Sequence, residues 1–230
     1  MNDSPPAPDT EAAAWFASAF SRLREQTARV VVGQVVPFAL LVLVLFGFAL
    51  DADHRTLRTF ASGLFWVAVL LSALLAVHRS AALEQSDGTM DALRMSGLPP
   101  AALFIGKATA VFVQLVLLEV VLLGGLLVLY GVQVVDPALL VVAGLLAGVA
   151  VAAAGTLYGA LASGLGGRET LLPILLLPVL APVLIGATRA FDDALGAVAV
   201  DGWAWTGLLA VAALIATVVG ALAHGVLIED

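Results

Sequence analysis

The chain has no cysteine and only one lysine, Lys107, among its 230 residues. Without thiols the protein can form neither disulfide bonds nor thiolate metal sites. Charged residues make up only 12% of the sequence, and the formal net charge is -7. This scarcity of positive charge excludes a broad basic surface, so the composition argues against nucleic-acid binding.

Apolar side chains, by contrast, make up 62% of the residues, whereas soluble domains have about half. A helix rises about 1.5 Å per residue, so about 20 apolar residues cross the ~30 Å hydrocarbon core of a bilayer. Six runs of that kind occur, at residues 30–50, 59–77, 108–130, 138–163, 170–188 and 203–228. The sequence therefore predicts an all-α, polytopic membrane protein with six transmembrane helices in residues 30–230.

The basic residues that flank these runs predict the orientation of the chain. Cytoplasmic loops retain most of the Lys and Arg near helix ends. One side of the predicted membrane has Arg22, Arg24, Arg29, Arg79, Arg94, Lys107 and Arg168, and the other has Arg55, Arg58 and Arg189. We therefore expect a multi-pass protein of the cell membrane with both termini in the cytoplasm.

The N-terminal part precedes the first run and divides into two segments. Residues 1–10 are polar and proline-rich, lack the basic start of a cleavable signal, and are predicted to form a disordered tail. In residues 11–29, apolar side chains recur at helical spacing: Trp15, Phe16, Ala19, Phe20 and Leu23. This pattern predicts an amphipathic helix at the membrane interface, although an extension of the first transmembrane helix fits it too.

Residues 78–107 form the longest polar stretch between two apolar runs. Asp87 or Thr89 can cap a helix after Gly88, and Gly97 with the two prolines that follow would end it after about two turns. Such a helix has Met90 and Leu93 on one side and is flanked by Asp91 and Arg94. From patterning alone, a rigid helix that passes force from a cytoplasmic partner and an ordinary connecting loop fit equally.

The stretch LEQSDGTMDALRMSGLPPAALFIGK, residues 83–107, resembles the cytoplasmic segment of ABC-2-type permeases. More narrowly, the sequence resembles the heme exporter protein B family of permease subunits. The positions that carry the resemblance are Asp87-Gly88-Thr89, Asp91, Leu93, Leu98-Pro99 and Lys107, joined by Trp66, Val67, Ala68, Leu71, Ser72 and Leu75 and by Pro178, Pro182, Ala187 and Thr188. Length and six-span layout agree with that family.

The resemblance implies a permease homodimer on a cytoplasmic ABC ATPase of the CcmA type, together with other membrane subunits of cytochrome c maturation. Heme would be the transported or handled ligand. ATP would bind to the partner subunit, because Gly106-Lys107 lacks the upstream Gly and following hydroxyl residue of a phosphate loop. The residues that would couple to the ATPase are Glu84, Asp87, Gly88, Thr89, Met90, Asp91, Leu93 and Arg94.

Two other functions stay open at this point. A permease of the same class could export a lipid or a drug, and a non-transporting scaffold of a membrane complex would have similar spans. The sequence contains no catalytic or metal-binding pattern. His54, His78 and His224 fall at predicted membrane edges, which favours interfacial positions over heme ligation.

Within the spans, Glu119 is the strongest candidate for a functional residue. A charged side chain at the centre of a transmembrane helix costs about 2.5–3.5 kcal/mol on insertion scales. Glu119 could serve as a gate, a subunit contact or part of a substrate path, or could be a partnered acid that serves packing.

Two further patterns in the spans concern helix shape and packing. Pro173, Pro178 and Pro182 predict a kinked fifth helix. Gly144, Gly148, Gly155, Gly159 and Ser163 place small residues along the fourth span, and they predict close helix packing within or between subunits.

Overall fold

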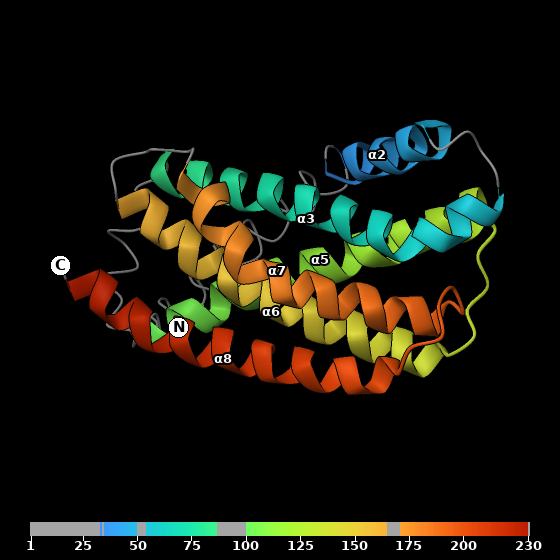
Figure 1. The fold of residues 1–230 in the computed structure, drawn as a ribbon. Coiled ribbons are helices and arrows are strands. Elements are labelled where there is room, and N and C mark those ends of the chain that lie inside the picture. Colours follow the sequence, from blue (N-terminus) through green and yellow to red (C-terminus); the bar gives the residue numbers. More distant parts are fainter. Residues whose placement is uncertain (1–32, 34, 50–53, 87–99, 165–170, 230) are drawn as a thin grey trace, which may run out of the picture.

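The computed structural model describes residues 33, 35–49, 54–86, 100–164 and 171–229, and every regular element among them is a helix. The helices are α2 (Val36–Ala49), α3 (His54–Ser86), α5 (Pro100–Tyr130), α6 (Pro137–Gly164), α7 (Leu171–Ala194) and α8 (Gly202–Glu229). They run lengthwise side by side in one bundle (Figure 1). The prediction of an all-α fold is confirmed.

Each helix coincides with one of the predicted runs, but two of them extend into the predicted loop 78–107. Helix α3 continues to Ser86, and α5 begins at Pro100. Residues 78–86 are rich in Ala, Leu, Glu and Gln, which are good helix formers, and proline is favoured in the first turn of a helix. The predicted tail 1–10, interface helix 11–29 and coupling helix 87–97 lie outside the described residues.

Four of the helices are long and apolar enough to cross a membrane. Their spanning parts are Arg55–Leu75, Ala101–Tyr130, Pro137–Leu161 and Gly202–Ala223. Helix α2 has 14 described apolar residues. Helix α7 has 24 residues but ends in the polar sequence that contains Arg189, Asp192 and Asp193. The fold is therefore that of a polytopic membrane protein.

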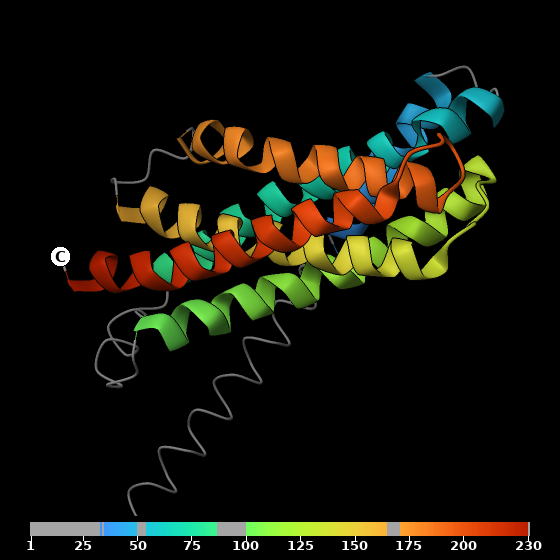
Figure 2. The same ribbon diagram turned by 60° about the horizontal axis from the view of Figure 1, so that its bottom comes forward.

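Helix α6 occupies the centre of the bundle. It packs against α3, α5, α7 and α8, whereas α2 lies at the edge against α3 and α5 (Figures 1 and 2). In the apolar part of α6, 67% of the residues are buried, compared with 22% of the residues in that of α8. Helix α6 can be surrounded in this way because its buried face consists largely of Ala and Gly, which allow neighbouring backbones to approach closely.

The bundle has two ends, which we name by one residue at each. At the Ser86 end, α3 ends and α5 begins; at the Asp136 end, α5 ends and α6 begins. The Asp136 end is closed by hydrogen bonds between its two connections, because the amides of Val135 and Asp136 both donate to the carbonyl of Ala194, at 2.8 and 3.1 Å.

Asp136 also organises side chains at this end. Its Oδ1 caps α6 by accepting from the amide of Leu139 at 3.0 Å, and its Oδ2 accepts from the indole of Trp203 at 3.2 Å. Gly131 precedes this region with a φ of 59°, a left-handed conformation that favours glycine. At the Asp136 end, backbone groups in the connections between helices are thus hydrogen-bonded.

Helix α8 packs against Phe104 of α5 at Gly220. A Cβ at this position would lie only 2.1 Å from Cζ of Phe104, whose side chain is fully buried. Gly207, on the same helix, has nothing within 4 Å of its Cβ position. The two glycines therefore differ in whether the packing requires the absence of a side chain.

We predict that Gly220→Ala destabilises the protein, whereas Gly207→Ala does not. The added methyl group at Gly220 must displace a buried ring, and overpacking of this kind costs about 1–3 kcal/mol. Thermal unfolding of the detergent-solubilised protein measures the effect, with Gly207→Ala as the matched control on the same helix. Equal stability of the two variants would contradict the close packing of α8 on Phe104.

Candidate functional site

Six buried residues of the described helices have polar or charged side chains: Ser62, Ser72, Glu119, Thr156, Asp192 and Thr206. The two threonines donate to carbonyls of their own helices, at Ala152 and Trp203. Ser62 and Asp192 bond to each other. Oε1 of Glu119 and Oγ of Ser72, in contrast, have no hydrogen-bond partner among the described residues. Glu119 is thus the one acid of this group without a partner for its buried oxygen.

Glu119 lies well inside the spanning part of α5, and its side chain is only 8% exposed. At about 1.5 Å per residue, residues 119–130 place it roughly 16 Å along the helix from the Asp136 end, near the middle of a ~30 Å core. Placing a carboxyl group there is costly, and the described structure offers no counter-charge in contact with it. Glu119 therefore remains the strongest candidate for a functional residue among the described buried acids.

The carboxyl group fits against two glycines of α6. A Cβ at Gly144 would lie 3.1 Å from Oε2 of Glu119, and a Cβ at Gly148 would lie 3.4 Å from Oε1. Gly144 and Gly148 are four residues apart and therefore lie on the same face of α6. We call Glu119, Gly144 and Gly148 the glycine notch. The sequence singled out all three residues, and the structure brings them together.

Aromatic rings border the glycine notch. Cε2 of Phe112 lies 3.3 Å from the Cβ position at Gly148, and Cζ of Phe191 lies 3.8 Å from that at Gly144. Phe191 also packs against the buried ring of Trp66, with ring centroids 5.1 Å apart and planes at 71°. The acid therefore lies against glycine backbone of α6 beside aromatic rings of α5 and α7, and Trp66 of α3 packs behind Phe191.

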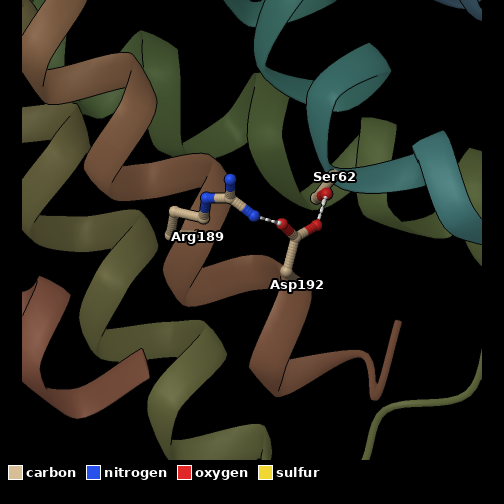
Figure 3. A network of polar contacts seen from close by, with 3 residues as sticks. All are labelled: Ser62, Arg189 and Asp192. Atoms are coloured by element: carbon tan, nitrogen blue, oxygen red, sulfur yellow. Dashed lines mark hydrogen bonds and ion pairs between the residues drawn. The ribbon is translucent and has the colours of Figure 1, made fainter. Parts of the chain in front are cut away.

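A second polar cluster joins α3 to α7 close to the Asp136 end (Figure 3). The hydroxyl of Ser62 donates to Oδ1 of Asp192, and Nη1 of Arg189 lies 3.6 Å from Oδ2 of the same carboxylate. Asp192 is 5% exposed, whereas the side chain of Arg189 is 47% exposed. This acid is satisfied by its neighbours, so the cluster acts as a structural link between α3 and α7.

The structure places the other predicted site residues as follows. Glu84 lies in the last turn of α3, and the remaining coupling residues, Asp87 to Arg94, lie outside the described residues. Pro173 falls in the first turn of α7, while Pro178 and Pro182 lie inside the helix. The predicted kinks and coupling contacts stay predictions.

Sequence reasoning did not assign a role to Asp192 or Trp66. The predicted span ended at residue 188, which left Asp192 outside the membrane segment, whereas α7 continues to Ala194. Ser62, a polar residue in the apolar start of α3, was the available signal for a buried partner. Among the described residues, no three His, Cys, Asp or Glu side chains are grouped as metal ligands.

A polytopic helical bundle with an intramembrane acid whose buried Oε1 has no hydrogen-bond partner among the described residues has the features of a membrane transport subunit, because such acids in membrane helices mark functional paths. The model of the CcmB protein family matches residues 22–229, so the chain belongs to that family.

Relatives named heme exporter protein B support this assignment. The Paracoccus denitrificans protein is 36% identical over 171 residues, which are 72% of this chain and 76% of the relative. The Rhodobacter capsulatus protein is 33% identical over 153 residues, 66% of this chain and 70% of the relative. The Escherichia coli K12 protein is 33% identical over 166 residues, 72% of this chain and 76% of the relative.

We predict that Glu119 and Gly144 are energetically coupled. In Gly144→Ala the new Cβ would lie 3.1 Å from Oε2, so the carboxyl group must shift by a few tenths of an ångström and the variant should be less stable than the unmodified protein. In the background of Glu119→Ala the oxygen that it would meet is absent, and the same change should cost little. The coupling energy should fall within the range of about 0.5–3 kcal/mol typical of contacting residues.

A double-mutant cycle on unfolding of the purified protein measures this coupling. Glu119→Ala combined with Gly207→Ala is the control, because Gly207 has open space around it and the two changes should add. Additivity of Glu119→Ala with Gly144→Ala would show that the carboxyl group does not sit against Gly144.

Proposed function

We propose that this chain is the permease subunit of an ABC-type complex that uses ATP hydrolysis on a separate subunit to handle heme during cytochrome c maturation. The observation that carries the proposal is Glu119, an unpaired buried acid in the glycine notch of a protein that belongs to the CcmB family. The names of the relatives supply heme as the ligand to be handled.

A separate ATPase subunit is supported by the position of the single Gly-Lys pair. Gly106 and Lys107 lie inside α5, six or more residues after its start at Pro100. A phosphate loop instead precedes its helix, so that free backbone amides can face the phosphates. The described helices therefore offer no nucleotide site at this pair, in agreement with ATP binding on a CcmA-type partner.

The proposed orientation places the Ser86 end in the cytoplasm. In this orientation the ATPase would contact residues 87–94, which connect α3 to α5 in the chain. Both helices run from that connection into the bundle, where α3 carries Trp66 and α5 carries Glu119. A displacement of the connection would therefore act on α5, which carries the acid, and on α3, whose Trp66 packs against Phe191 beside the glycine notch.

The notch is suited to a sliding contact between α5 and α6. The two glycines leave a smooth backbone surface along which the carboxyl group can change its neighbours, and no hydrogen bond of the buried Oε1 has to break. We therefore assign the acid to the moving part of the permease.

Other members of the proposed complex follow from the family. A permease homodimer and further membrane subunits of the maturation system would complete it, in the inner or plasma membrane with both termini in the cytoplasm. The exposed apolar side chains on α5 and α8 are suited to contact with lipid.

We predict that Met90 and Leu93 supply the apolar contact with the ATPase. Fully burying such side chains contributes about 1.5–3 kcal/mol each, so Met90→Ser with Leu93→Ser should release the ATPase and abolish cytochrome c maturation. Replacing the charged flanks, Asp91→Ser with Arg94→Ser, is the matched control and should weaken binding less. Pull-down of the ATPase and an assay of cytochrome c maturation measure the two effects.

Gly88→Ala should give a different result, because it favours a continuous helix and re-aims the contact residues without removing them. We expect this variant to retain most of the bound ATPase but to lose maturation. Full ATPase recovery and full maturation with the Met90/Leu93 double variant would show that residues 87–97 are only a connector.

A further inference from the structure

A second buried polar group without a partner lies close to the glycine notch. The indole Nε1 of Trp66, a side chain only 2% exposed, has no hydrogen-bond acceptor among the described residues. More than nine-tenths of buried polar groups in proteins are hydrogen-bonded to protein or to ordered water, so each exception requires an explanation. Leaving a buried donor unsatisfied costs about 1–3 kcal/mol.

Trp66 and Glu119 border the same aromatic surface. The ring of Trp66 packs edge-on against Phe191, and Phe191 approaches Gly144. Oε2 of Glu119 also approaches Gly144, and its Oε1, which has no hydrogen-bond partner among the described residues, approaches Gly148, one turn further along α6. Trp66 of α3 and the carboxyl group of α5 therefore have the neighbours Phe191 and Gly144 between them.

The two groups are also chemically complementary. An indole N–H can only donate a hydrogen bond, whereas a carboxyl group has oxygens that accept hydrogen bonds in either protonation state. A water molecule does both, and a buried water typically makes about three hydrogen bonds to otherwise unsatisfied groups.

We propose that Trp66 and Glu119 form an intramembrane hydration site that binds one or more water molecules between the indole N–H and the carboxyl group. The site would give Glu119 a hydrogen bond that does not tie α5 to any one position. Water can follow the carboxyl group as helices shift, whereas a fixed side-chain partner would hold it. This site lies inside the helix bundle, and its presence does not depend on which cargo the protein handles.

The test uses the four tryptophans of the chain, Trp15, Trp66, Trp203 and Trp205. Labelling with 15N-indole tryptophan gives one N–H signal for each residue, and Trp66→Phe assigns the signal of Trp66. Magnetisation transfer from water to each indole proton is then measured with the protein in lipid nanodiscs. Trp203, which is 49% exposed, provides the positive reference.

We expect water-to-indole transfer at Trp66 in the unmodified protein despite its burial. Glu119→Met, which removes the polar group at similar size, should reduce this transfer several-fold. Glu119→Gln, which can still hydrogen-bond to water, should retain it. Transfer at Trp203 should be the same in all three proteins.

Two results would overturn the proposal. One is the absence of transfer at Trp66 in the unmodified protein while Trp203 shows it. The other is transfer at Trp66 that is unchanged in Glu119→Met, which would place the water away from the carboxyl group. The first result needs no variant, so the proposal can be rejected even where Glu119→Met fails to fold.

Discussion

The contact between the carboxyl group of Glu119 and the backbone of Gly144 and Gly148 constrains the arrangement of the central helices. Any side chain on α6 at these two positions would meet the carboxyl oxygens at 3.1–3.4 Å. The distance between α5 and α6 is therefore set by an acid on one helix and by missing side chains on the other. Because Oε1 has no partner among the described residues, the contact positions the acid without a hydrogen bond to that oxygen.

Hydrogen bonds join several helices at the Asp136 end of the bundle. At the Asp136 end, backbone hydrogen bonds to Ala194, the Asp136 contacts and the Ser62–Asp192 bond connect α3, α6, α7 and α8. At the Ser86 end, α3 and α5 lead into residues 87–99. We interpret Glu119 as lying between a firmly joined end and the end where a partner would act. A force applied at the Ser86 end would then move α5 along α6.

Apolar run length was enough to predict the helices, because crossing a bilayer imposes a length that few other structures require. The cost of an acid in hydrocarbon likewise pointed to Glu119, and the spacing of small residues pointed to α6. The contact between Glu119 and the glycines of α6 was not predictable, because it depends on which faces α5 and α6 turn toward each other. The helical ends at Ser86 and Ala194 were also missed, since polar residues that continue a helix beyond the apolar run leave no mark in hydropathy. Asp192 was missed for this reason.

The central claim is that Glu119 serves the activity and not only the packing of the bundle. Glu119→Gln tests it most directly, because the amide keeps the shape of the carboxyl group in the glycine notch and removes its charge. Cytochrome c maturation is measured in cells that contain normal amounts of correctly inserted variant. The account predicts a large loss of maturation with little change in thermal unfolding. Full maturation at normal stability would contradict it and would leave Glu119 as a packing residue.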